Sequence, residues 1–340
     1  MKSTFATVVL LVFLIFLNFV CGPATPVNFW LEILQDDRGL ISGVLSQKAI
    51  FELRLVHIIL ASATGFALAT AGRSMQNFLQ NTLADPHVVG LSAGSTTAVL
   101  LTILFAPSFA QFVFADWFPA LWLSALAGSV FAFFVLRALF QKFARVWGPP
   151  ALALSGLFLN AGLSALLMVI FARLSPSSLS EVQSWTLGAI QPYSVFQSVF
   201  LLPFLLLPSL YLIAVDRQLV LSSLGQDFAL SNGIQVPTLR TRVLVALMVL
   251  SSASVCAAGS IGFVGLLVPH LTRRWMLFAP RVWMRPVFNG LMGACVLLCA
   301  DLLSRTLTAP GELPIGVYTA LFSVPFLFLV LARSRREVHS

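Results

Sequence analysis

The sequence predicts an all-α membrane protein with ten transmembrane helices in a single domain that covers residues 1–340. Of its residues, 59% are hydrophobic and only 9% are charged, whereas a soluble domain has about 25% charged residues. The mean hydropathy is +0.95. So few charges cannot cover a water-facing surface, so most of the surface must face lipid or another apolar partner.

Apolar runs close to the ~20 residues that cross a bilayer recur along the whole chain. The eighth run is interrupted by Gly262, Gly265 and Pro269, which predicts a short or broken helix there. The first run has an alternative reading as a signal peptide, but Val20 is too bulky for the position before a cleavage site. The ten predicted helices lie near 4–21, 53–72, 88–106, 117–140, 150–172, 195–215, 240–258, 261–278, 286–304 and 313–332.

The basic residues predict the orientation of these helices. If all ten segments span and the N-terminus is cytoplasmic, 15 of the 20 Lys and Arg residues fall inside and five outside. This asymmetry is the one that membrane insertion imposes, and it places both termini in the cytoplasm. The net charge of +8 does not indicate nucleic-acid binding, because the basic residues lie in short loops rather than in one stripe.

One inside loop, residues 219–236, is longer than a tight turn requires. Its apolar and polar residues alternate as on an amphipathic surface, and Gly225 and Gly233 interrupt it. We therefore expect two short helices broken at one of these glycines. The segment is either a linker on the membrane surface or a docking surface for a cytoplasmic partner.

The sequence lacks the patterns of several chemistries. No lysine follows a glycine, so no phosphate-binding P-loop is present, and no HExxH or Ser/His/Asp set appears at catalytic spacing. The four cysteines form no CxxC pair, and we expect no metal site. Asp301 and Arg305 are four residues apart, so they can pair on one helix face. We expect neither an enzyme nor a cofactor bound by this chain.

Three long motifs carry a resemblance to a known family. The first runs from Leu53 to Gly94 and contains Asn81-Thr82-Leu83-Ala84-Asp85-Pro86. The second is the run Gly259–Arg273 with Val268-Pro269-His270, and the third extends from Ala300 to Phe326. Together they resemble the permease family of iron-siderophore, haem and vitamin B12 ABC importers, from about residue 50 to the C-terminus.

The resemblance implies partners and a location. Such a permease forms a dimer, of two copies or of two different chains, in the bacterial inner membrane. Two cytoplasmic ATPase subunits hold the ATP and magnesium, and a substrate-binding protein docks outside. Among the substrates, iron–siderophore is expected because that branch is the most populous, with haem and vitamin B12 as alternatives. A secondary transporter is the rival from another class, and the scarcity of mid-membrane charges argues against it.

The resemblance also assigns roles to individual residues. The outer arginines that meet the binding protein correspond to Arg54 and Arg305, and His57 stands where a second arginine is common. Arg54 could instead be an interfacial anchor, and Arg305 could instead pair with Asp301. The residues that resemble the coupling helices, which fit a groove on the ATPase, are Leu221, Leu224, Gly225, Gln226, Asp227 and Gly233.

The fifth segment supplies candidates for the substrate pathway. Ser155, Asn160 and Ser164 could line the pathway, or could form hydrogen bonds between helices.

The first motif departs from the pattern of the family it resembles. In it, Asn77 replaces a glycine, Gln80 an arginine and Thr82 a proline. These changes put the local helix breaks in question and are compatible with pairing to a different permease.

Overall fold

The computed structural model describes residues 2–20, 47–110, 113–114, 118–147, 151–172, 183, 185–191, 193–276, 284–307 and 313–337. Within this part, each of the ten predicted segments coincides with one helix of 13 residues or more. These helices are α1 (Lys2–Val20), α3 (Gln47–Leu79), α4 (Leu91–Phe105), α6 (Ala120–Trp147), α7 (Ala151–Phe171), α9 (Val195–Ser222), α11 (Val236–Ala258), α12 (Val264–Met276), α13 (Met284–Thr306) and α14 (Ile315–Glu337).

Short elements connect some of these helices. They are a 3-10 helix η1 (Pro86–Val89), α5 (Pro107–Ala110), α10 (Gln226–Ser231) and an antiparallel pair of two-residue strands, β1 (Val113–Phe114) and β2 (Phe118–Pro119). The strand pair is the only departure from an all-α fold in the described part of the chain. The prediction of the fold class is therefore correct in outline.

Six of the helices are long and apolar enough to cross a membrane: α3, α6, α7, α9, α11 and α13. Shorter apolar stretches occupy Ala6–Val20, Leu91–Phe105 and Ile315–Phe326. The eighth segment is a short helix, as expected, because α12 starts only at Val264, and Phe263 before it has a φ of +69°. A phenylalanine rarely adopts this left-handed conformation, so the surrounding packing must hold it there. Gly265 and Pro269 lie inside α12 without ending it.

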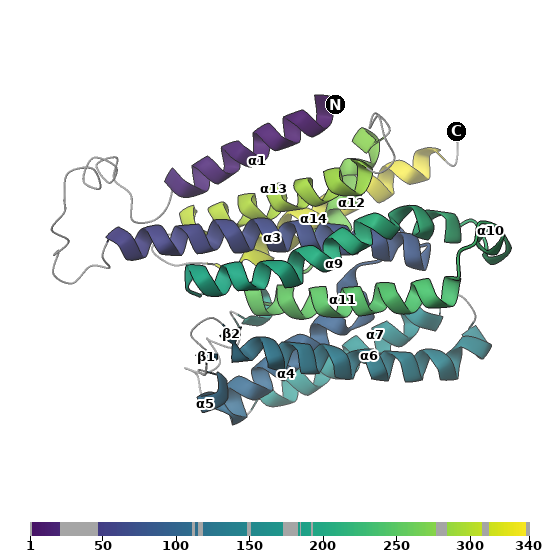
Figure 1. Cartoon of the computed structure of the whole chain (residues 1–340), viewed down its shortest axis with the longest axis horizontal. Helices are drawn as coiled ribbons and strands as arrows, with labels where there is room; N and C mark the ends of the chain where they lie inside the picture. Colours follow the sequence, from purple (N-terminus) through teal and green to yellow (C-terminus); the bar gives the residue numbers. More distant parts are fainter. Residues whose placement is uncertain are drawn as a thin grey trace.

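The helices run side by side along the long axis of the molecule (Figure 1). Helix α3 is central and packs against α13, α9, α12 and α11. Helices α4, α6 and α7 form a second group, which α11 joins to the first through its contacts with α4 and α6. Helix α1 lies on the outside of the bundle against α13.

Glycines allow α3 to approach its neighbours closely. A Cβ atom on Gly65 would clash with the backbone of Gly293 in α13, and one on Gly72 would clash with the backbone of Gly265 in α12. Small residues at such crossings let two helix backbones touch, which is how helices associate where lipid removes the hydrophobic driving force. These crossings fix α3 between α12 and α13.

Candidate functional site

The segment between α9 and α11 forms a short helical projection. Helix α9 continues to Ser222, and a turn leads to Gly225, whose φ is +129°. Helix α10 then spans six residues, and Gly233, with a φ of +75°, ends the turn that follows it. We expected two short helices broken at one glycine. The structure instead has one short helix between two glycines, with α9 in place of the first.

Helix α10 lies at one end of the molecule (Figure 1), and it and the turn before it expose apolar side chains. Leu224 is 65% exposed, Phe228 46% and Leu230 60%, whereas Ala229 is fully buried and anchors the helix. Asp227 is exposed in the first turn, and the side chain of Gln226 lies outside the described part. Neighbouring exposed apolar residues of this kind are typical of a surface that binds another protein.

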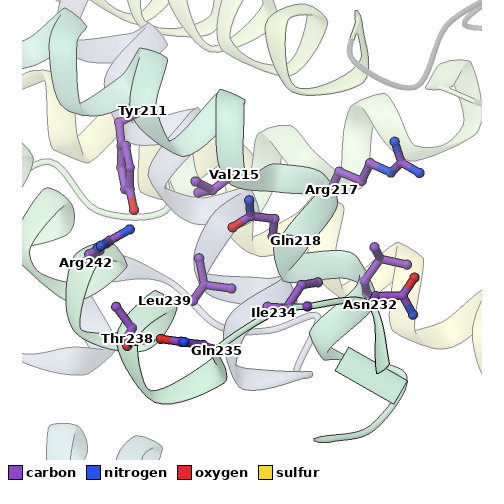
Figure 2. A pocket seen from close by; sticks show the side chains of 12 residues that line it. Tyr211, Val215, Arg217, Gln218, Asn232, Ile234, Gln235, Thr238, Leu239 and Arg242 are labelled. Carbon is purple, nitrogen blue, oxygen red and sulfur yellow. Dashed lines mark hydrogen bonds between the residues drawn. The ribbon is translucent and has the colours of Figure 1, made fainter. Parts of the chain in front are cut away.

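A cavity of about 520 Å³ opens between the adjoining ends of α9 and α11. Figure 2 shows Tyr211 and Gln218 of α9 and Arg242 of α11 converging on this space. Leu221 and Gly233 also line it. The cavity therefore connects two of the predicted coupling residues, and its polar lining can accept hydrogen-bonding groups.

A polar link joins α3 to the end of α9. Arg73 donates from Nε to Asp216 Oδ1 at 2.8 Å and from Nη2 to Oδ2 at 3.0 Å. Asn77 Nδ2 donates to Asp216 Oδ1 at 3.2 Å, and Gln80 Nε2 donates to the Ser223 carbonyl oxygen at 3.2 Å. We call these five residues the α3–α9 link.

Two residues that depart from the family pattern take part in the α3–α9 link. Asn77 and Gln80 both contact the helix that leads into α10. Sequence reasoning did not assign a role to Asp216 or to Arg73. The available signal was a carboxylate at the end of an apolar span, which requires a partner, but the partner lies 143 positions away in the sequence.

The three predicted docking residues lie together at the other end of α3. Arg54 is buried and donates from Nη1 to the Phe19 carbonyl oxygen at 2.7 Å, at the C-terminus of α1. This bond satisfies a carbonyl that has no partner within its helix. His57 Nδ1 lies 2.8 Å from Asp301 Oδ1 of α13. Arg54 and His57 therefore join α3 to two different helices.

Arg305 completes this buried network. Its Nη2 donates to Asp301 Oδ2 at 2.6 Å and to Asn18 Oδ1 of α1 at 2.6 Å. Arg305 is 5% exposed and Asp301 is fully buried. The pairing of Arg305 with Asp301, which the spacing allowed, is thus present, while docking by Arg54, His57 and Arg305 stays a prediction. We call Asn18, Arg54, His57, Asp301 and Arg305 the α1–α13 network.

The three candidate pathway residues of α7 have different surroundings. Ser155 is fully buried, Asn160 is half-buried and Ser164 is exposed. Asn160 lines a mainly apolar cavity of about 840 Å³, to which α12, α14 and the backbone around Gly262 also contribute. Neither serine lines that cavity, so the structure brings only Asn160 to a possible pathway.

The described residues contain no group of three or more His, Cys, Asp or Glu side chains that could hold a metal ion. Cys256, Cys295 and Cys299 are free thiols. The ion pairs of the described residues lie in two places, in the α3–α9 link and in the α1–α13 network. Both arrangements join helices.

Comparisons with known proteins agree with this arrangement. The model of the FecCD transport family matches residues 9–333. The chain is 32% identical to the iron(3+)-hydroxamate import system permease protein FhuG of Bacillus subtilis over 288 residues, covering 85% of this chain and 84% of that protein. It is 33% identical to the hemin transport system permease protein HmuU of Yersinia pestis, with 84% and 83% covered.

Two further comparisons extend this range. The vitamin B12 import system permease protein BtuC of Vibrio cholerae is 33% identical, with 85% of this chain and 84% of that protein covered. Among solved structures, an inward-facing conformation of a transporter described as metal-chelate type superposes with a TM-score of 0.78. The identity there is 26%, and the match covers 97% of this chain and 98% of that one.

Proposed function

The chain belongs to the FecCD transport family and is an ABC importer permease, and we propose that its cargo is an iron–siderophore complex, which it moves into the cytoplasm by alternating access. The permease itself is not catalytic. A separate pair of ATPase subunits hydrolyses ATP, with its magnesium, and a binding protein delivers the substrate from outside. The single observation that carries the ATPase-driven part of this proposal is the α10 projection with its exposed apolar side chains.

We propose that all ten long helices span the bacterial inner membrane with both termini in the cytoplasm. The excess of basic residues in the inside loops supports this orientation. The start of α1, the end of α14 and α10 lie toward the same end of the bundle (Figure 1), and Arg54 lies near the start of α3, at the opposite end of the bundle. This geometry would direct α10 toward the cytoplasmic ATPase and the α1–α13 network toward the binding protein.

Movement of the ATPase subunits would pass from α10 into the bundle through α9 and α11, the two helices on either side of it. A partner groove would take Leu224 and Phe228, whose exposed side chains lose contact with water on binding. Movement of α10 would then reach α3 through the α3–α9 link, because Gln80 is bonded to the carbonyl of Ser223 next to the turn. A rigid helix joined by a bidentate ion pair can transmit such a displacement.

The cavity beside Asn160 would form one side of the pathway. It opens on the outside of this chain and is lined by α7 and α14, both of which expose apolar residues such as Phe158, Met168 and Leu321. A second permease, of the same or of a different chain, would face these helices and close the pathway. The mainly apolar lining suits a bulky chelate that is not held tightly during passage.

Membership of the FecCD transport family does not by itself identify the cargo as an iron–siderophore complex. The relatives named for iron-hydroxamate, hemin and vitamin B12 are similarly close in identity. Haem and vitamin B12 are therefore the alternatives within the family. A secondary transporter, the rival from another class, would use α10 as a passive linker and would need no ATPase.

The test is uptake into vesicles that contain the chain with its ATPase, its binding protein and any sister permease. Radiolabelled iron–siderophore, haem and cobalamin would be compared, with an ATPase-dead partner as the control. ATP-dependent uptake of iron–siderophore alone supports the proposal. Uptake of only haem or cobalamin replaces the substrate and keeps the importer, and uptake that persists with the dead ATPase contradicts the coupling mechanism.

A further inference from the structure

A cavity that the transport cycle described above does not use lies beside α10. Its volume is about 450 Å³, and it is bounded by α6, α11, the start of α7 and the end of α3. Leu230 of α10 lines it as well. Most of its lining is apolar and comes from Phe133, Leu136, Phe140, Leu152, Val236 and Leu244.

Two arginines stand among these apolar side chains. Arg137 of α6 and Arg240 of α11 both line the cavity. Within the described part of the chain, the ion pairs involve other basic residues, namely His57, Arg73 and Arg305. The Arg240 guanidinium lies 5.8 Å from the centre of the Phe78 ring, so a cation–π contact helps to hold it at the cavity. Gln141 adds a group that can form hydrogen bonds.

This combination defines the chemistry of an occupant. An apolar space favours a hydrocarbon chain, and two guanidinium groups that pair with no carboxylate among the described residues favour an anion with several oxygen acceptors. An anionic phospholipid has both parts in one molecule. Basic pockets between transmembrane helices on the cytoplasmic side are known to bind anionic headgroups.

We propose that this cavity binds one anionic phospholipid, with its phosphate on Arg137 and Arg240 and one acyl chain against Leu136 and Leu244. The proposal rests on the orientation given under the proposed function, because it requires α10 at the cytoplasmic headgroup level. Leu230 would then contact the lipid near its glycerol and headgroup region, and this contact would support α10 from the membrane side. The bound lipid would thereby influence the position of the surface that meets the ATPase.

Lipid retention by the purified full-length chain tests the proposal without any transport. Native mass spectrometry would compare phosphatidylglycerol with phosphatidylcholine of the same acyl chains. We expect one phosphatidylglycerol to be retained and phosphatidylcholine to be lost. The double variant R137Q/R240Q should weaken phosphatidylglycerol retention by on the order of 10-fold or more, because both headgroup contacts are removed.

A matched control removes the same charge from the same two helices. Lys142 lies on α6, and Arg242 lies on α11 and lines the cavity between α9 and α11. The variant K142Q/R242Q should retain phosphatidylglycerol as the wild type does. Equal loss in both double variants would mean that net charge alone attracts lipid, and this result would overturn the proposal.

A third variant tests the hydrocarbon part. Thr241→Trp places a large ring at the cavity and leaves both arginines in place, so it should also reduce retention of phosphatidylglycerol. Equal retention of the two lipids by the wild type, or no retention at all, would refute the site. Uptake assays are separate, so a failed lipid site would leave the importer assignment standing, and a failed uptake assay would leave the lipid result interpretable.

Discussion

Arg73 of α3 binds both carboxylate oxygens of Asp216 in α9, at 2.8 and 3.0 Å. Asp216 is buried, with 3% of its surface exposed, so Arg73 rather than water compensates the carboxylate. Such a bidentate pair fixes direction as well as distance. It therefore sets the position of the last turns of α9, from which the coupling projection starts.

Replacing Arg73 should destabilise the protein more than replacing Asp216. Arg73→Gln leaves a buried carboxylate without its cation, which costs about 3 kcal/mol. Asp216→Asn removes the carboxylate that pairs with Arg73, but the Arg73 side chain is 16% exposed and stays partly hydrated, so this change should cost less, about 1–2 kcal/mol. Thermal unfolding in detergent measures both. Arg217→Gln, an exposed neighbour, is the control and should change stability by less than about 0.5 kcal/mol. A larger loss in Asp216→Asn than in Arg73→Gln would contradict this account of the pair.

Asn77 should contribute through its side chain. Asn77→Ala removes the 3.2 Å bond to Asp216 and should cost about 1 kcal/mol. Asn77→Gly, which restores the residue usual in the family, should cost roughly 1 kcal/mol more because glycine weakens a helix interior. Uptake per ATP hydrolysed would fall in both variants if the α3–α9 link transmits movement. Unchanged coupling with lowered stability would restrict Asn77 to a structural role.

Gly225 and Gly233 should resist substitution because of their backbone angles. Nothing lies within 4 Å of a Cβ at either position, so alanine would not clash. Their φ values of +129° and +75° are nevertheless unfavourable for alanine, at a cost of order 1–3 kcal/mol each. We expect G225A and G233A to lower ATP-driven uptake while the bundle still folds.

Gly162 provides the matched control for these two substitutions. It lies within α7, and nothing is within 4 Å of a Cβ placed there. Gly162→Ala should therefore leave uptake intact and slightly increase stability, since alanine favours a helix. If G225A and G233A transported as well as G162A, the geometry of the two turns would not matter for coupling.

Variants in the α1–α13 network can distinguish a structural role of Arg305 from a role in docking. Asp301→Asn weakens the interaction that positions Arg305 and leaves the positive charge of Arg305 in place. If Arg305 only joins helices, D301N and R305A should both lower thermal stability, by about 1–3 kcal/mol, and neither should change affinity for the binding protein. If Arg305 docks, R305A alone should weaken that affinity, measured with the purified binding protein, and D301N should preserve it.

The sequence was sufficient for the helices because each apolar run is about as long as a bilayer is thick. It also offered the Asp301–Arg305 pair as an alternative to docking, because that pair depends only on the spacing within one helix. It could not predict that Asp216 meets Arg73, or that Asn18 meets Arg305, because these contacts depend on how distant helices pack. It likewise could not show which of the three candidate residues of α7 lines the cavity of about 840 Å³. Asn160 does and Ser155 and Ser164 do not, because packing against the neighbouring helices sets the rotation of α7 about its axis.

The contact between Asn18 and Arg305 has a consequence for biogenesis. The two residues are 287 positions apart, and at roughly 5–20 residues per second a ribosome needs some tens of seconds to make that length. During this time Asn18 is in the chain and Arg305 is not. Until then the contact with Arg54 of α3 is available to α1, whereas α13, against which most of α1 packs, is made only when synthesis is almost finished.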